Sequence, residues 1–452
     1  MSDVGSHVFL SLGRTCRESL AFLRDTILSV SNGDYFLNFM PKPIFLRCDH
    51  LAIKIALMFV LYSEQSLAQS FLFPGASTTF ESGLSQTNTR GAAAVASNPA
   101  NTLLTKRIES YADMTIVNFS YSYQRAGYEP AKIALTAPPV NFGASFKPKS
   151  NVAFGFFFTP RPGLDAMKIK SVPFAMDTTV LPVDIEQKSS TFFTALGGAI
   201  KVNKYTAVGL SILETAEDSQ LIVRQEGTTS DDDALVGMRY RGISTQFLLG
   251  LRTVPNSSMT IAGSIRTSTV RSYRGTEIIK GDQDNIIRKK SFSPTVLAVG
   301  AERRFGAPAA FGEVKYEAWS QGKSSNSSGL PGATKQNAFN DIIILIVGGR
   351  LKLPGGHSGS ASIGIYPHNV GLGSVTEESS SSGTVSGVQF GEFDALDRTM
   401  FSASYRLSRK KLDVTAGFNV INGLRSVPEA YPGAGKYTLS VFSLGAGGSY
   451  YF

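Results

Sequence analysis

The chain has 452 residues, a formal net charge of +9 and only 17% charged residues. An ordinary soluble domain carries about 25% charged residues, and no segment after residue 70 reaches the ~18 unbroken apolar residues of a membrane helix. These totals argue against an ordinary soluble domain and against a helical membrane protein. A mean hydropathy near zero without such helices is typical of a β-barrel whose strands alternate apolar outward and polar inward residues.

The positive charge does not indicate a nucleic-acid partner, because the basic residues are dispersed and lack the stacking aromatics of a nucleic-acid module. No enzyme constellation is present either. The sequence contains no nucleophile elbow, metal-ligand spacing or phosphate loop. Two of the four histidines precede residue 51, and His357 and His368 fall in expected loops. We therefore expect no catalysis, no metal and no cofactor.

A short apolar run over residues 51–62 follows two basic residues and ends before the small-residue site Ser66-Leu67-Ala68. This layout is that of a cleavable secretory signal peptide, and the run is too short to span a membrane. Translation from Met40 would give a leader of normal length. We therefore predict an extra N-terminal extension at 1–39, a signal peptide at 40–68 and a mature chain beginning at Gln69. An amphipathic N-terminal helix is the alternative.

Both cysteines, Cys16 and Cys48, lie in the part that we expect to be removed. The predicted mature chain therefore has neither a disulfide nor a thiolate metal site.

From about residue 111 the sequence consists of segments of 9–16 residues with period-two alternation, the pattern of half-buried strands. In the last segment Phe442, Leu444 and Phe452 share one face, while Ser443 and Ser449 share the other. We predict fourteen strands, at about 113–125, 136–147, 151–160, 190–202, 204–214, 236–252, 257–273, 292–305, 309–320, 340–353, 359–367, 399–407, 411–421 and 437–452.

The connections between these strands alternate in length. Tight turns, such as 202–204 and 354–356, alternate with long polar segments near 161–189, 215–235, 274–291, 321–339, 368–398 and 422–436. Short turns on one side and long loops on the other are the signature of an outer-membrane barrel. We predict that residues 111–452 form an all-β, antiparallel transmembrane β-barrel in the bacterial outer membrane, crossing it many times. A soluble β-sandwich is the alternative.

The chain ends in an aromatic pair, Tyr450 and Phe452, on the last predicted strand. This ending resembles the C-terminal signal that barrel-assembly machinery recognises, and an ordinary aromatic edge strand is the alternative. The expected partners are that machinery, outer-membrane lipid and lipopolysaccharide, and we expect a monomer.

Residues 69–110 lack strand alternation and are rich in small residues, including Gly91-Ala92-Ala93-Ala94 and Asn98-Pro99-Ala100. A barrel of fourteen strands is wide enough to need a filling. We predict that this segment is a hatch, or plug, in the lumen, where Pro99 fixes φ and Asn98 bonds neighbouring backbone groups. A flexible periplasmic tail is the alternative.

The small-residue segment, its place before the first strand, the strand number and the aromatic C-terminus together resemble the FadL/TodX family of long-chain fatty-acid and hydrocarbon transporters. The resemblance covers most of residues 69–452. It implies a plugged barrel with an apolar N-terminus reaching the ligand, for which Phe71, Leu72 and Phe73 are the candidates, beside Asn98, Pro99 and Ala100. It also implies an exit at a kinked strand, for which Pro138-Pro139 is a marker.

The expected ligand is a hydrophobic small molecule, with one cation for a carboxylate. The candidates for that cation are basic residues inside predicted strands: Arg239, Arg241, Arg252, Arg266, Lys315 and Arg406. Lumen-lining or loop-stabilising charge is the alternative for each of them. For the whole chain, a general diffusion porin and a structural or adhesive surface barrel remain alternatives to hydrophobic uptake.

Overall fold

The computed structural model describes residues 86–124, 126–127, 130–137, 140–162, 167–176, 179–225, 234–279, 285–321, 340–368, 376–380, 383–387, 396–427 and 435–452. The predicted extension, signal peptide and first part of the plug, with Phe71, Leu72 and Phe73, lie outside these residues. So do Pro138-Pro139 and the predicted loop at 322–339.

One antiparallel sheet contains every strand of the described residues. Their bounds are β1 (Ile108–Gln124), β2 (Ala131–Ala137), β3 (Val140–Lys149), β4 (Val152–Pro162), β5 (Met167–Met176), β6 (Thr179–Lys201), β7 (Thr206–Gln225), β8 (Ala234–Asn256), β9 (Met259–Arg266), β10 (Thr269–Ile279), β11 (Asn285–Ser293), β12 (Thr295–Arg304), β13 (Pro308–Ala318), β14 (Ile342–Leu353), β15 (His357–Tyr366), β16 (Thr376–Ser380), β17 (Gly383–Gly387), β18 (Asp397–Ser408), β19 (Leu412–Val427) and β20 (Gly435–Tyr451).

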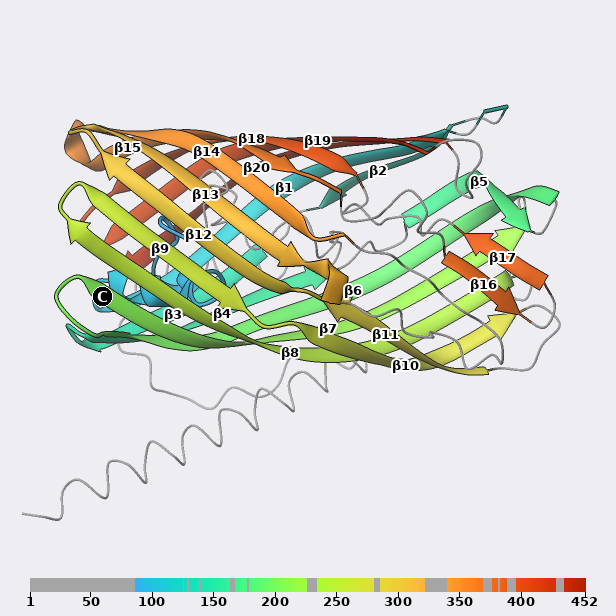
Figure 1. Ribbon diagram of the computed structural model, residues 1–452, viewed down its shortest axis with the longest axis horizontal. Helices are drawn as coiled ribbons and strands as arrows, with labels where there is room; N and C mark the ends of the chain where they lie inside the picture. Colours follow the sequence, from blue (N-terminus) through green and yellow to red (C-terminus); the bar gives the residue numbers. More distant parts are fainter. Residues whose placement is uncertain are drawn as a thin grey trace, which may run out of the picture. The chain divides into compact units, whose positions relative to one another are not determined.

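Eight of these strands form four end-to-end pairs, and the two members of each pair together make one barrel strand. β2 and β3 both pair with β1, β4 and β5 with β6, and β9 and β10 with β8, while β11 and β12 follow β10 and β9. Apart from the hairpin β16–β17, the described residues therefore form fourteen barrel strands. β20 pairs with β1 along its length, from Tyr451↔Glu109 to Lys436↔Gln124, and this pairing closes the barrel (Figure 1). The prediction of a closed fourteen-stranded barrel is confirmed.

The prediction of long polar loops was wrong in part. The segment 161–189 contains β5 and half of β6, and 215–235 contains the end of β7. β10 and β11 likewise extend into 274–291. The ladder continues there because strands beyond the membrane still pair their backbones, even where they carry many charged and polar residues. The segment 368–398 contains the hairpin β16–β17, whose Val385 pairs with Met176 of β5.

The two faces of the wall differ as the sequence predicts. On β20, Phe442 and Leu444 are 43% and 51% exposed on the outside, whereas Ser443 between them is 1% exposed. On β8, the outer face changes from Ile243, Phe247 and Leu249 to Arg241, which marks one edge of the apolar band. The apolar band on the outer face places the barrel in a membrane. A closed barrel is suited to that place, because it leaves no backbone group unpaired in lipid.

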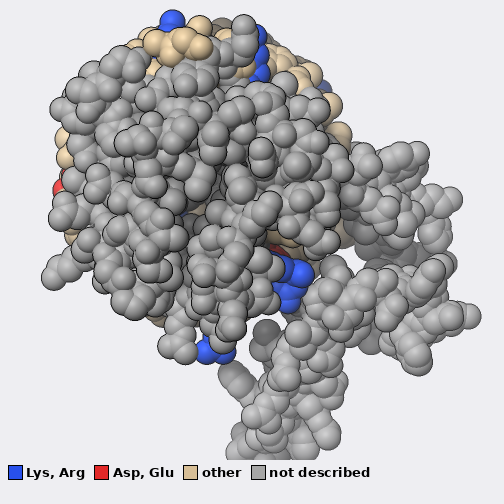
Figure 2. Space-filling model, turned by 90° about the vertical axis from the view of Figure 1, so that its right-hand side faces the viewer, with Lys and Arg blue, Asp and Glu red and all other residues tan. Residues whose placement is uncertain are grey.

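The short turns and the C-terminus lie at one end of the barrel, on the left in Figure 1. Figure 2 faces the opposite end, where the described atoms that are visible form a margin with separate patches of Lys and Arg. In outer-membrane barrels the short turns face the periplasm, and we name the two ends accordingly. The described helices are α4 (Gly91–Ala94), η1 (Pro99–Leu104), η3 (Trp319–Gln321) and η4 (Pro354–Gly356). None of them is long and apolar enough to cross a membrane.

Candidate functional site: the plug and the lumen wall

The segment Gln86–Thr105, here called the plug, lies inside the barrel near the short-turn end (blue in Figure 1). Its helix α4 is buried throughout, and Ala92, Ala94 and Val95 have no exposed surface. η1 packs against β6, β7 and β8, and α4 packs against β3 and β4. The small side chains let the segment fold against the wall. The described barrel begins at Ile108, directly after the plug.

Inward-facing glycines of the wall receive the plug. A Cβ at Gly209 would lie 2.5 Å from the backbone N of Ala100, and one at Gly155 would lie 2.8 Å from Val95 Cγ1. Gly143 and Gly250 would meet Ala92 and Pro99 at 2.8 and 2.7 Å. These distances are too short for real side chains. The glycines are therefore required for the close approach of plug and wall.

Asn98 joins the plug to two wall strands. Its Nδ2 donates to the carbonyl oxygens of Leu251 on β8 and Gly263 on β9, at 3.1 and 3.2 Å. The same nitrogen also lies 3.4 Å from the Gln86 carbonyl oxygen, and Oδ1 accepts from the N–H of Ala100 at 3.1 Å. Asn98 therefore caps η1 and fixes the plug, while Pro99 begins η1 as its first residue.

Two wall carboxylates accept hydrogen bonds from the plug backbone. Glu109 of β1 accepts from the N–H of Ala92 at 3.2 Å, and its oxygens also accept from Ser145 and Ser449 at 2.6 and 2.5 Å. Glu313 of β13 accepts from the N–H of Gln86 at 3.0 Å and pairs with Lys315 at 3.1 Å. Both carboxylates are buried and bonded. They anchor the plug from different strands of the wall.

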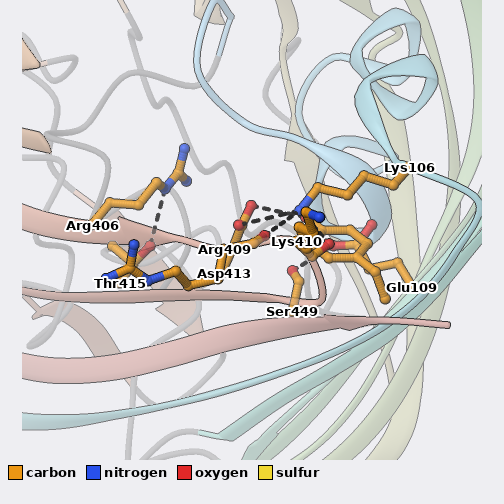
Figure 3. A network of polar contacts seen from close by, with 9 residues as sticks. Lys106, Glu109, Arg406, Arg409, Lys410, Asp413, Thr415 and Ser449 are labelled. Atoms are coloured by element: carbon orange, nitrogen blue, oxygen red, sulfur yellow. Dashed lines mark hydrogen bonds and ion pairs between the residues drawn. The ribbon is translucent and has the colours of Figure 1, made fainter. Parts of the chain in front are cut away.

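The plug continues into β1 through Lys106, shown in Figure 3. Its Nζ donates to the carbonyl oxygens of Arg409 and Lys410 at 2.7 and 3.1 Å and lies 3.6 Å from Asp413 Oδ1. Asp413 Oδ2 accepts from the Tyr451 hydroxyl at 3.0 Å. A cavity of about 30 Å³ lies between this part of the wall and the plug, enough for one or two water molecules.

Above the plug, toward the long connections, the inner wall is largely apolar and aromatic on β1, β20, β19, β18 and β14, whereas β13 places Glu313, Lys315 and Glu317 beside Ile346, Ile344 and Ile342. The buried residues of this apolar wall are Phe119, Tyr121, Tyr123, Ile342, Ile344, Ile346, Met400, Ile421, Tyr437, Leu439 and Val441. Tyr123 and Tyr437 stack with ring centroids 4.7 Å apart.

The apolar wall ends at one row of paired residues. In the last apolar row, Val441 pairs with both Phe119 and Ile421, Ile421 with Met400, Met400 with Gly364, and Gly364 with Ile346. The next inward row toward the plug runs Val117, Ser443, Asn419, Ser402, Ser362 and Gly348 across the same six strands. The inner face therefore changes from apolar to polar at the same height on three neighbouring strands, β20, β19 and β18, whereas Val117 on β1 stays apolar. The sequence shows this change along single strands, but only the register aligns it.

The predicted cations are scattered rather than gathered at one site. Arg239 and Arg241 share the outer face of β8 with Ile243, and both pair with Asp218, Arg241 at 2.6 Å. They cannot reach a ligand in the lumen, because alternate residues of a strand face opposite sides. Their role as cations for a ligand carboxylate stays a prediction that this placement does not support.

The other four predicted cations face inward. Arg252 lies near Glu302, which accepts from Arg350 and Arg304 at 2.8 and 3.0 Å. Arg266 interacts with Glu317, and Lys315 pairs with Glu313. Arg406 donates to Thr415 Oγ1 at 3.2 Å, near Asp413. Each of these cations already has an acidic neighbour.

The terminal aromatics lie on the outer face of the last strand. Tyr450 and Phe452 are 38% and 54% exposed, and their rings meet edge to face with centroids 4.9 Å apart. A role in assembly stays a prediction. Sequence reasoning missed the wall glycines and the two anchoring carboxylates. Glycine at inward strand positions was the available signal for the former.

The fold is similar to several solved structures, among them a FadL homologue and two toluene transporters. The structure of a Pseudomonas aeruginosa FadL homologue matches with a TM-score of 0.60 and 12% identity, over 83% of this chain and 97% of that one. The Pseudomonas putida toluene transporter TodX matches with a TM-score of 0.58 and 13% identity, over 84% and 98%. The Ralstonia pickettii toluene transporter TbuX matches with 0.52 and 14%, over 80% and 94%.

No family model and no curated sequence matches the chain. At identities of 12–14% the likeness concerns the fold. It agrees with the barrel architecture that the sequence predicts. Within the described residues, no group of three His, Cys, Asp or Glu side chains could hold a metal ion.

Proposed function

We propose that the protein is an outer-membrane channel for the uptake of small hydrophobic molecules, such as long-chain fatty acids or hydrocarbons, with the plug closing its lumen. The observation that carries the proposal is the row at which the apolar wall meets the polar, plugged half of the barrel. An apolar ligand gains about 0.8 kcal/mol for each CH2 that it buries against such a wall. The likeness to proteins described as toluene transporters supports the same conclusion.

Residues 69–105 act in this proposal as the hatch, with Phe71, Leu72 and Phe73 in contact with the ligand and Asn98-Pro99-Ala100 fixing the plug. A carboxylate, where the ligand has one, would meet an inward-facing cation such as Arg252 or Arg406. The signal peptide at 40–68 would direct the chain to the cell envelope, and the pair Tyr450 and Phe452 would direct its assembly.

The test uses the full chain folded in detergent and titrated with an 18-carbon fatty acid, with toluene and with glucose. Val441→Asp places a charge in the apolar wall, and Ser440→Asp is the matched control, because Ser440 is exposed on the other face of the same strand. Val441→Asp should weaken fatty-acid or toluene binding at least tenfold, while Ser440→Asp leaves it unchanged. Deleting residues 69–75 should abolish binding.

Planar-bilayer conductance separates the alternatives. A plugged barrel gives only brief, small currents, and large steady currents with free passage of glucose would establish a general diffusion porin instead. Binding of neither hydrophobe, with no current, would favour a structural or adhesive barrel.

A further inference from the structure

The short-turn end of the barrel carries ten exposed basic residues, here called the basic rim: Lys106, Arg107, Lys149, Lys201, Lys204, Arg303, Lys352, Arg409, Lys410 and Lys411. They occur at the start of β1 and at five of the short turns, and so surround the barrel. Of the ten, only Lys106 belongs to the plug contacts described above.

The described carboxylates at this end do not balance the rim. Glu109 and Glu302 are 2% and 3% exposed, and the Asp413 side chain is 13% exposed. All three are engaged within the wall, Glu109 by Ser145 and Ser449, Glu302 by Arg304 and Arg350, and Asp413 by Tyr451. The exposed side-chain charge of the described rim is therefore positive only. Such a surface attracts anions, and its field extends about 8–10 Å at physiological salt.

The neighbours of these cations indicate which anion they meet. Lys204 lies between Val202 and Tyr205, which are 62% and 47% exposed, and its Nζ is 4.7 Å from the Tyr205 ring centroid. Arg303 lies 5.3 Å from the ring centroid of Phe305, which is 59% exposed. Exposed aromatic rings and cations at a barrel end are typical of the membrane interface, where long basic side chains extend toward the headgroups.

The same arrangement recurs at another turn. Lys411 precedes Leu412, which is 43% exposed. Cations within one or two residues of lipid-facing apolar side chains lie at headgroup height. A soluble acidic partner would instead be met by charges that project away from the apolar band.

We propose that the basic rim binds anionic phospholipid headgroups of the periplasmic leaflet, and so fixes the height of the barrel in the membrane. This inference needs the barrel and its orientation, but it does not depend on which molecule the channel carries. Zwitterionic headgroups carry no net charge and gain little from such a rim.

The test measures lipids retained by the full chain in native mass spectrometry, from mixed micelles with equal amounts of phosphatidylglycerol and phosphatidylcholine. The rim variant combines Lys204→Glu, Arg303→Glu and Lys410→Glu. The control combines Lys132→Glu, Arg274→Glu and Lys436→Glu, which change the same charge at exposed positions nearer the other end. A milder variant with Gln at the three rim positions guards against a failure to fold.

We expect the wild-type chain to retain phosphatidylglycerol over phosphatidylcholine at least fivefold. In the rim variant this preference should fall at least threefold. It should fall less in the Gln variant and stay unchanged in the control. Equal losses in rim variant and control, or no preference in the wild-type chain, would overturn the proposal. A polyglutamate peptide that displaces phosphatidylglycerol at equal charge concentration would also overturn it in favour of a soluble acidic partner.

Discussion

Replacing Asn98 with alanine tests whether the plug is held by the contacts described above. Asn98 has no exposed surface, and its amide donates to the Leu251 and Gly263 carbonyls of the wall while accepting from the N–H of Ala100. A net hydrogen bond contributes about 1 kcal/mol, and a buried N–H left without a partner costs about 1–3 kcal/mol. Asn98→Ala should therefore weaken plug docking by about 3 kcal/mol, which corresponds to about a 100-fold rise in the undocked population.

The assay is hydrogen exchange of the plug amides, with the frequency of opening events in planar bilayers as a second readout. Asn203→Ala is the matched control, because Asn203 also accepts two backbone hydrogen bonds, from Tyr205 and Thr206 at 2.8 and 2.9 Å, but in an exposed turn. Plug protection should fall only in Asn98→Ala. Unchanged protection there, or an equal fall in Asn203→Ala, would refute the assignment of Asn98 as the anchor.

Three further substitutions probe the plug seat, the lipid face and the base of the plug. Gly209→Leu should expel the plug, because the added Cβ would lie 2.5 Å from Ala100 N; plug exchange should rise, whereas Gly349→Leu, whose Cβ would have its nearest neighbour at 3.6 Å, should leave it unchanged. Leu249 lies on the outer face at 53% exposure. Leu249→Arg should lower the free energy of unfolding, measured in urea from vesicles, by about 2–4 kcal/mol. A loss no greater than that of Leu249→Met would contradict the placement of Leu249 in lipid. Lys106→Met should cost no more than about 1 kcal/mol, since its side chain is 44% exposed and its ion pair is long at 3.6 Å; a larger cost in the same unfolding assay would show that the base of the plug contributes more than its exposure suggests.

The sequence predicts the wall well because the lipid and the lumen impose opposite demands on alternate residues. In the last strand, Phe442 and Leu444 face outward and Ser443 inward, as their polarity indicates. The same reasoning fails where the outer face no longer meets lipid. Over β5 and the first half of β6 apolar residues still alternate with charged ones, as in Val183-Asp184-Ile185-Glu186, but the polarity of the segment as a whole suggested a loop.

The plug and its contacts were less predictable for a different reason. Its position before β1 and its small residues indicate a filling for the lumen, but no local pattern pairs Glu109 with Ala92 or Glu313 with Gln86, 17 and 227 residues apart. Arg241 was misplaced because a basic residue in a strand indicates the lumen only where the opposite face meets lipid. On β8 the apolar band has already ended there.

The unpaired backbone groups of the plug explain why the wall around it is polar. α4 has four residues and η1 six, so most of the plug N–H and C=O groups find no partner within a helix. The wall therefore supplies acceptors, namely Glu109, the carbonyls of Leu251 and Gly263, and Glu313, which lies in the same row as Ile346. Above that row the inner wall on β1, β20, β19 and β18 is largely apolar. A hydrophobic ligand gains no burial by moving below the row at Ser443 unless the plug moves, and breaking the Asn98 contacts alone costs about 3 kcal/mol. Burial of about four CH2 groups offsets that cost. A chain of 16–18 carbons can bury several times as many groups, whereas the seven carbons of toluene can gain less than half as much toward moving the plug.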